Sequence, residues 1–396
     1  MICRSWTYLL GVCFYQGINA GIQLIYFWGL CVQMEMEETK ASYLWQMSHF
    51  SCLLLSLLGG LLWIVQIPAS LAGFWSLPVG LLQLEFTVLA LIGSLFGGFY
   101  FKKKYFWGIG FINCILCSSF FSVSCAQESV GVNLLSWNVA GSNDSQIPCL
   151  RNYVTHWSQQ HERKIVFLQE VQQQHKTDFE KALQMTCFWS DYVQKKSNAT
   201  GLLVCHDQTW ESNEDKKLPY ESGEDYGFQF LELKDKRTNN TINLLNIHLE
   251  SLWRTLDNMY GKSDSITLKE SFVETIRGNP EILLPVLKAN AKSQRSEIDA
   301  LFAFLKNFKD PTLIAGDFNS PPNLWFHRYL RKHYNDAHVK TGFGFGYTTF
   351  RLNFIRSRVD YLYASPELLL TGNTWVDRDT SCSDHFPVLS SFSFSN

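Results

Sequence analysis

The sequence Ser383-Asp384-His385-Phe386-Pro387, near the C-terminus, is the most informative stretch of this 396-residue chain. It places a carboxylate beside an imidazole, and Pro387 limits how the backbone can continue. Metal-assisted hydrolysis of a phosphoester needs both kinds of group at one reacting centre. An Asp-His pair can also simply close a strand at the protein surface, so the polar residues upstream decide between the two interpretations.

Polar residues upstream lie where apolar, β-rich runs of sequence begin or end. Strand ends are where a rigid scaffold presents chemical groups, so we expect these side chains to form a site. In an extended chain, side chains two positions apart share a face, which places Asp317 and Asn319 on the same side. The residues are Asn138, Glu170, His248, Asp317, Asn319, Asp360 and His385, beside runs at 132–137, 164–169, 241–247, 312–315, 358–364 and 388–394.

The order of the predicted elements indicates the fold class. Helical patterns at 149–161 and 179–185 alternate with strands, whereas the runs at 201–205 and 228–233 follow one another. The stretch 252–310 is helical in character. This mixture predicts an α/β protein in which helices pack outside layered sheets.

The residue types match what the hydrolysis of a phosphoester by water requires, which is an activated water, a neutralised phosphate oxygen and correct alignment. Mg²⁺ held by one or two carboxylates supplies much of the electrostatics. Glu170 is the natural first ligand, and Asn138 can hold that ligand or a bound water. Asp317 is placed to orient or deprotonate the attacking water, and Asp360 is a candidate partner for His385.

Two further side chains, Asn319 and His248, can donate hydrogen bonds to phosphate oxygens as negative charge builds there. Taken singly, these residues have plainer interpretations. Glu170 could be a solvated strand end, Asn138 a turn former and His248 a core histidine. Taken together, their sequence contexts match a known order.

In the order of these motifs along the sequence, the chain resembles the endonuclease/exonuclease/phosphatase superfamily, which has the DNase I-like fold. The resemblance implies a two-layer β-sandwich flanked by helices that hydrolyses phosphoesters with Mg²⁺ or, as a second option, Mn²⁺. The matching segments, all in family order across about residues 130–396, are LLSWN (134–138), FLQEV (167–171), NIHLES (246–251), AGDFNSPP (315–322), RVDYLY (358–363) and SDHFPV (383–388).

The resemblance also implies a role for each candidate site residue. In some members of the superfamily the paired histidine is treated as the base, so Asp317 and His385 both stay open for that role. The implied roles are metal ligand for Glu170, with Asn138 and Asp384 close by, base for Asp317, phosphate contacts for Asn319 and His248, and catalytic pair for Asp360 and His385.

Residues 1–125 are far more apolar than the rest and predict an all-α transmembrane region ahead of a catalytic domain at 126–396. A span needs about 20 apolar residues. Three or four candidates are present, at about 6–32, 44–67, 79–101 and 105–125. Because basic residues prefer the cytoplasmic side, Lys102-Lys103-Lys104 place the catalytic domain outside the cytoplasm. We therefore expect a multi-pass integral membrane protein, similar to bacterial membrane-anchored members of the superfamily.

The expected function is that of a membrane-anchored, Mg²⁺-dependent phosphodiesterase or other phosphoester hydrolase. Its expected partners are the lipid bilayer and a phosphoester, which could be a lipid headgroup or another extracytoplasmic substrate. The alternative is an anchored nuclease that cleaves DNA or RNA, although residues 126–396 are slightly acidic and lack the basic footprint of a tight duplex binder. A non-catalytic membrane interaction module is a third option, disfavoured because every catalytic position is filled.

Four of the 11 cysteines lie in residues 126–396, namely Cys149, Cys187, Cys205 and Cys382. Their spacings match no zinc pattern, and spacing cannot reveal a disulfide pairing. Buried free thiols are the favoured interpretation of these four residues.

Overall fold

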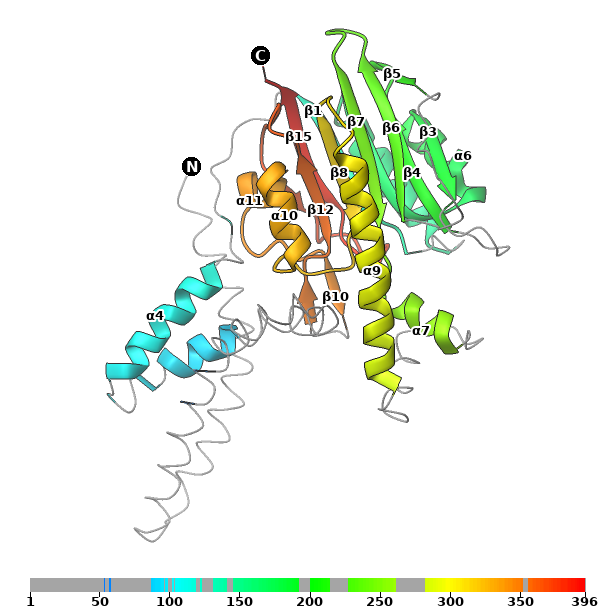
Figure 1. The fold of residues 1–396 in the computed structure, drawn as a ribbon. Helices are drawn as coiled ribbons and strands as arrows, with labels where there is room; N and C mark the ends of the chain where they lie inside the picture. Colours follow the sequence, from blue (N-terminus) through cyan, green and yellow to red (C-terminus); the bar gives the residue numbers. More distant parts are fainter. Residues whose placement is uncertain are drawn as a thin grey trace, which may run out of the picture.

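Figure 1 shows the computed structural model of the chain. It describes residues 87–95, 97–98, 104–118, 131–140, 145–191, 200–213, 227–260, 282–351 and 355–395, together with the single residues Leu53, Leu57, Lys102 and Ser122. The described residues from 131 onward contain two large sheets and the helices that cover them.

The first sheet combines one parallel strand pair with antiparallel neighbours. Its central strands β1 and β2 run parallel, and β1 also pairs antiparallel with the C-terminal strand β15. A short additional strand, β14 (Trp375–Val376), also pairs with β15. The strand order is β13 (Leu368–Leu370), β15 (Val388–Phe394), β1 (Val132–Asn138), β2 (Lys164–Gln172), β4 (Thr200–His206) and β3 (Thr186–Asp191).

The second sheet has the same plan. Strands β7 and β8 form its parallel pair, and β12 lies antiparallel to β8 on the other side. A small separate hairpin is formed by β10 (Thr349–Arg351) and β11 (Ile355–Ser357). The strand order is β5 (Trp210–Asn213), β6 (Phe228–Asp235), β7 (Thr241–His248), β8 (Thr312–Asp317), β12 (Asp360–Ala364) and β9 (Asn335–Asp336).

The two sheets pack face to face through a shared apolar core. Leu134 and Phe167 of the first sheet belong to one buried cluster with Leu244 and Leu313 of the second. Leu135, which follows Leu134 in β1, belongs instead to the cluster on the outer face of the first sheet. This alternation follows from the two-residue period of a strand, which sends successive side chains to opposite faces.

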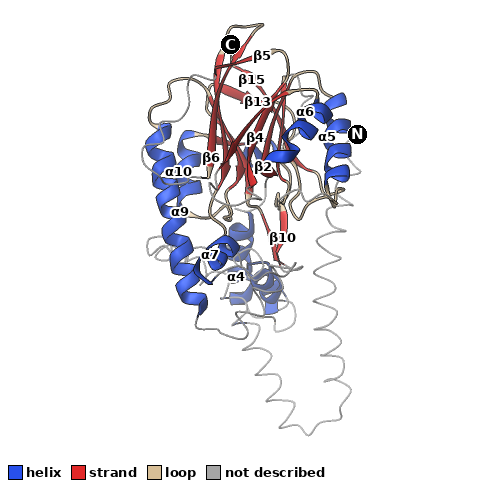
Figure 2. Ribbon diagram, turned by 90° about the vertical axis from the view of Figure 1, so that its right-hand side faces the viewer, coloured by secondary structure: helices blue, strands red, loops and turns tan. Residues whose placement is uncertain are grey.

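Helices cover both outer faces, as Figure 2 shows. On the first sheet lie α5 (Ile147–Gln159) and α6 (Lys176–Leu183), and on the second lie α9 (Leu283–Leu305) and α10 (Trp325–His333). The predicted α/β sandwich flanked by helices is therefore confirmed. The shorter elements are η1 (Gln173–His175), α7 (Leu252–Tyr260) and α11 (Ala337–Thr341).

The stretch expected to be helical at 252–310 contains two separate helices in its described parts, α7 and α9. Residues 261–281 lie outside the described residues. The sequence patterns missed the edge strand β3, and they missed α10, whose nine residues are fewer than the roughly 11 to 18 over which a helical period is read.

The predicted localisation as a multi-pass membrane protein with an extracytoplasmic catalytic domain is corrected by the structure. Within the part of the chain that is described, no helix combines the length and apolar character needed to cross a bilayer. The last predicted span overlaps α4 (Lys104–Ser118), and residues 119–121 lie outside the described residues. The segments at 6–32 and 44–67 lie outside the described residues, apart from Leu53 and Leu57.

The four cysteines of the sandwich form two disulfides, so their interpretation as free thiols is wrong. Cys187 joins Cys205 between the paired strands β3 and β4. Cys149, in α5, joins Cys382, next to the loop that contains Ser383 and His385. This second bond crosses 233 positions of sequence, a distance over which spacing carries no information.

Candidate active site

The second sheet brings three of the expected side chains into one row. His248 ends β7 and pairs in register with Asp317, which ends the parallel strand β8. Asp360 begins the antiparallel strand β12 and also pairs with Asp317. Because residues in register on adjacent strands point to the same side, the three side chains lie at one edge of the sandwich.

The first sheet adds Asn138, at the end of β1, and Glu170, on β2. The pairing of β2 with β4 shifts register between Leu168 and Val171, which marks a bulge around Glu170. Glu170 has a positive φ of 59°, a backbone conformation that costs free energy in a residue with a side chain. A bulge of this kind re-aims the side chain, and here it directs the carboxylate toward Asn138.

Asn138 connects the two sheets at this edge. Its Nδ2 donates to Glu170 Oε1 at 3.0 Å and to Asp317 Oδ2 at 3.0 Å. Its Oδ1 accepts the backbone N–H of Ala140 at 2.9 Å, which fixes the orientation of the amide. One buried amide therefore holds a carboxylate of each sheet in place.

The pair formed by His385 and Asp360 closes the site. The imidazole Nδ1 lies 2.9 Å from Asp360 Oδ2, and Nε2 lies 3.8 Å from Asp317 Oδ2. Ser383 secures the loop, because its Oγ donates to the carbonyl of Asn138 at 2.7 Å and accepts the N–H of His385 at 3.1 Å. The indole of Trp137 donates to the carbonyl of His385 at 2.9 Å.

The charge state of His385 follows from these neighbours. Burial by itself would lower its pKa, but the negative charges of Asp360 and Asp317, together with the hydrogen bond to Asp360, raise the pKa to about 10. At neutral pH His385 is therefore an imidazolium, and its Nδ1–H donates to Asp360.

His248 has the opposite electrostatic character. Its Nε2 lies 3.4 Å from Glu170 Oε1 and 3.8 Å from Asp317 Oδ2. Burial lowers the pKa of His248 to about 4, although the charge of Asp317 acts in the other direction. The site therefore contains one neutral and one protonated imidazole at neutral pH.

The carboxyl group of Glu170 is also perturbed. Burial raises its pKa, the hydrogen bond from Asn138 lowers it, and the charges of Asp384 and Asp317 raise it further. Asp384 itself is exposed, and its carbonyl accepts a hydrogen bond from the hydroxyl of Thr349. Asp384 thus lies at the solvent rim, close enough for its charge to act on Glu170.

Asn319 follows Asp317 at the end of β8 and has a positive φ of 48°. Its backbone N–H donates to Asp317 Oδ1 at 2.7 Å, and its side-chain Nδ2 donates to the carbonyl of Leu249 at 2.9 Å. One of the two amide hydrogens of Asn319 is therefore engaged with the chain next to His248. All eight residues expected from the sequence belong to this one edge of the sandwich, with Asp384 at its rim.

The structure adds supporting residues that the sequence did not single out. The hydroxyl of Thr348 accepts the backbone N–H groups of Val359 and Asp360, both at 3.1 Å, which holds the start of β12. Ser383 stands inside the quoted C-terminal motif, so its neighbours pointed to it. Thr348 carries no comparable signal.

A buried amide pair lies beneath the site, between the sheets. Gln169 Nε2 donates to Asn246 Oδ1 at 2.7 Å. Asn246 Nδ2 donates to the carbonyls of Leu168 and Leu203, at 3.0 and 3.2 Å, which fixes the orientation of the Asn246 amide. Gln169 precedes Glu170 and Asn246 lies two residues before His248, so this pair ties together the strands that carry those two side chains.

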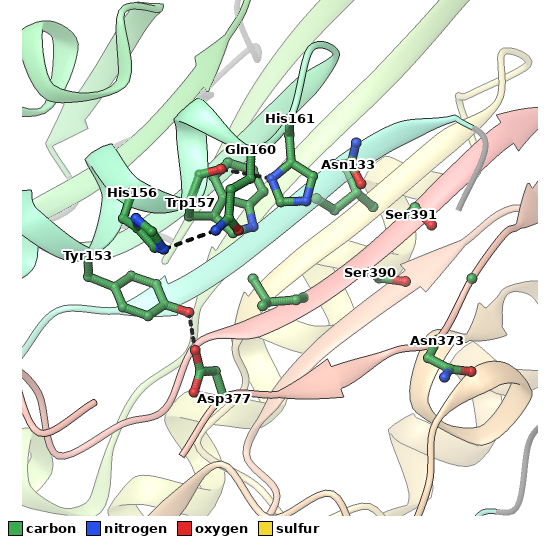
Figure 3. A pocket seen from close by; sticks show the side chains of 13 residues that line it. Asn133, Tyr153, His156, Trp157, Gln160, His161, Asn373, Asp377, Ser390 and Ser391 are labelled. Carbon is green, nitrogen blue, oxygen red and sulfur yellow. Dashed lines mark hydrogen bonds between the residues drawn. The ribbon is translucent and has the colours of Figure 1, made fainter. Parts of the chain in front are cut away.

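A cavity of about 380 Å³ lies beside α5, and Figure 3 shows the side chains that line it. Its lining includes His156, His161 and Asn373. Tyr153 donates to Asp377 Oδ2 at its edge, at 2.8 Å. None of the eight candidate site residues lines this cavity.

Comparison with known proteins identifies the family. The family model of the Endonuclease/Exonuclease/phosphatase family matches residues 135–385. This range contains all eight candidate site residues and ends at His385. The chain therefore belongs to this family, whose members are phosphoester hydrolases. A comparison with curated proteins found no match.

A comparison with solved structures found matches that include the following three proteins. An endonuclease/exonuclease/phosphatase from Bacteroides vulgatus is 15% identical, with 67% of this chain and 100% of that chain covered and a TM-score of 0.47. The mannosyl-6-phosphatase of Bacteroides thetaiotaomicron is 16% identical, with 67% and 100% covered and a TM-score of 0.44. The catalytic domain of human Nocturnin, with bound sulfate anion, is 15% identical, with 67% and 96% covered and a TM-score of 0.43.

Proposed function

We propose that residues 126–396 form the catalytic domain of a divalent-metal-dependent phosphodiesterase, with Mg²⁺ as the expected ion and Mn²⁺ as a substitute. The observation that carries this proposal is the cluster at the sandwich edge, where Asn138 bridges Glu170 and Asp317 between a neutral and a protonated imidazole. Family membership supports phosphoester hydrolysis as the reaction class.

The donor set fits a hard cation. Mg²⁺ and Mn²⁺ favour carboxylate and amide oxygens and keep several waters, so their ligands must be reachable from solvent. The side chain of Glu170 is 30% exposed, and Asp384 is exposed beside it. We assign Glu170 as the metal ligand. Asn138 supports it through the hydrogen bond to the Glu170 carboxylate, and Asp384 provides a second carboxylate nearby. Such an ion would neutralise negative charge on the phosphate oxygens.

Among the described residues, the ligand atoms of Asp317, Asp360 and His385 also lie within 4.8 Å of one another. All three residues are buried, and Asp360 is hydrogen bonded to His385 instead of facing an open position. We therefore assign these three residues to proton transfer, and we assign metal binding to the more exposed Glu170.

Proton transfer from the attacking water is assigned to Asp317. An imidazolium has no free lone pair, so the raised pKa of His385 disfavours it as the base. Asp317 is held by hydrogen bonds from Asn138 and from the backbone of Asn319, which fix the direction of its carboxylate. We assign His248, which is neutral and adjacent to Asp317, and the side-chain amide of Asn319 as donors to phosphate oxygens.

The test is an assay of the full chain on supercoiled plasmid DNA, RNA, sphingomyelin and phosphoinositides, with Mg²⁺ or with EDTA. We expect hydrolysis of at least one of these phosphodiesters with Mg²⁺, and at least about 100-fold less in the Asp317→Asn variant. Asp299→Asn is the matched control, because Asp299 is an exposed acid in a surface ion pair on α9. Hydrolysis that survives both EDTA and Asp317→Asn would sink the proposal, and the cleaved substrate distinguishes a nuclease from a lipid phosphodiesterase.

A further inference from the structure

Helix α9 carries a row of buried polar side chains. Asn290, Gln294 and Glu297 are at most 6% exposed and are spaced four and three residues apart, which places them on one face of the helix. The same face continues with Ile298 and Leu301, which pack on the second sheet. The apolar part seats the helix on the sheet, so the polar part must face something that needs hydrogen bonds.

That partner is the chain directly after His248. The backbone N–H of Glu250 donates to Glu297 Oε2 at 2.8 Å. The carbonyl of the same residue accepts Gln294 Nε2 at 2.7 Å and Asn290 Nδ2 at 3.3 Å. The backbone of Glu250 is therefore held by α9 through both its N–H and its carbonyl.

The sheet and the neighbouring loop hold the preceding two residues. The N–H of His248 donates to the carbonyl of Gly227 at 2.6 Å, and that of Leu249 to the carbonyl of Asp317 at 3.0 Å. The carbonyl of Leu249 accepts Asn319 Nδ2. Strand pairing thus ends at Leu249, and the side chains of α9 take over at Glu250.

The same helix face also reaches Asn319, just after the end of β8. Gln294 Nε2 lies 3.5 Å from the carbonyl of Asn319, at the limit of a hydrogen bond. Gly227, directly before β6, approaches the carbonyl of His248 so closely that a Cβ there would lie 1.7 Å from that oxygen. Burial raises the pKa of Glu297 to about 8, although backbone hydrogen bonds from Glu250 and Gly227 lower it. The backbone around His248 is therefore closely packed, and part of it is held by side chains of α9.

We propose that Gln294 and Glu297 are positioning residues for His248, because they clamp the Glu250 peptide and thereby hold the imidazole 3.4 Å from Glu170. This inference rests on the proposed phosphodiesterase function for its kinetic readout. A displacement of about 1 Å in a reacting group lowers a rate by up to about 100-fold. The bonds to Glu250, at 2.7 and 2.8 Å, are much shorter than the 3.5 Å contact of Gln294 with Asn319, so we assign the effect to His248.

The test compares Gln294→Met, which keeps the length of the side chain but removes its donor, with Lys292→Gln at an exposed position of the same helix. Kinetics of the full chain on bis(p-nitrophenyl) phosphate with Mg²⁺ should show kcat lowered about 10- to 100-fold in Gln294→Met. KM should change less than about threefold, because the substrate contacts are retained. Lys292→Gln should leave both constants unchanged.

A double-mutant cycle with His248→Ala separates positioning from general destabilisation. If Gln294 acts through His248, adding Gln294→Met to the His248→Ala variant should change kcat by less than about twofold. Losses that multiply would overturn the inference. The conservative variant Glu297→Gln, which keeps one acceptor oxygen for the Glu250 N–H, should retain more activity than Glu297→Leu.

A second measurement does not depend on activity. With ¹⁵N-labelled histidine, the imidazole resonances of His248, assigned by their loss in His248→Ala, should shift in Gln294→Met and stay unchanged in Lys292→Gln. Unshifted resonances in Gln294→Met would refute the positioning role. Absence of hydrolysis in the unmodified chain, by contrast, would overturn the proposed function, while these resonances would still decide the inference.

Discussion

Replacing Asp360 by Asn removes one charge from the buried pair with His385 while leaving a side chain of the same shape. The Asn amide oxygen can still accept from Nδ1, so the ring should keep its place 2.9 Å from residue 360. The larger of the negative charges that oppose the effect of burial is lost, however, while that of Asp317 remains. We therefore expect the pKa of His385 to fall from about 10 toward its ordinary value of 6.5.

The consequence for stability follows from proton linkage. Between pH 6.5 and about 10 the folded chain keeps a proton on His385 that the unfolded chain has released. The contribution of this group to the free energy of unfolding is therefore complete below pH 6.5 and is lost as pH rises through about 10. The slope is about 1.4 kcal/mol per pH unit, so the loss between about pH 7 and about pH 9 is on the order of 3 kcal/mol.

The assay is urea unfolding of both proteins in EDTA at these two pH values, combined with NMR titration of the imidazole. The unmodified chain should lose up to about 3 kcal/mol more than Asp360→Asn between the two pH values. Comparing the two profiles removes the contributions of other groups, such as the raised pKa of Glu297. Parallel pH profiles, or a His385 that titrates near 6.5 in the unmodified chain, would refute the reasoning about its charge.

Two further outcomes follow from the buried contacts. Gln169→Leu leaves the Oδ1 of Asn246 without its donor, so the free energy of unfolding should fall by about 1–3 kcal/mol, and an unchanged urea midpoint would contradict the tie between the sheets. Replacing Cys149 and Cys382 together by Ala removes the bond beside the Ser383–His385 loop, and thermal unfolding should show a loss of about 2–5 kcal/mol. If the doubly substituted chain unfolds at the same temperature as the unmodified one, this disulfide does not stabilise the fold.

Each of the two sheets contributes different residues to the candidate active site. The first sheet supplies Glu170 and Asn138, and the second supplies the row that contains Asp317. Hydrogen bonds from Asn138 and the buried Gln169–Asn246 pair cross between the layers. Because buried polar groups carry a large penalty when unpaired, these bonds make the relative position of the sheets specific.

Much of the candidate site could be read from local sequence. His248 directly follows the apolar run 241–247 and Asp317 lies two residues after the run 312–315, and each is the last residue of its strand, where the side chains were expected. Glu170 was expected just after its run, but the strand continues past it to Gln172 with a bulge around Glu170. The turn of its carboxylate toward Asn138 depends on the pairing of β2 with β4, which local sequence does not specify.

The contacts that support the site could not be read in this way. Gln294 and Glu297 look like ordinary polar positions of a long helix until the loop after His248 is placed beside them. The bond between Cys149 and Cys382 depends on bringing α5 next to the C-terminal loop. The apolar N-terminal sequence predicted membrane spans, but no helix among the described residues is long and apolar enough to cross a bilayer.

The sequence by itself therefore determined the family, the layered α/β class and the chemical groups around the Ser383–Pro387 motif, because residue type and strand-end position are local properties. Only the tertiary structure decided that Asp384 lies at the rim while His385 is buried between Asp360 and Asp317. It also decided which imidazole is charged. The physical reason is that burial and the charges of distant residues set a pKa, and both arise only when the two sheets come together.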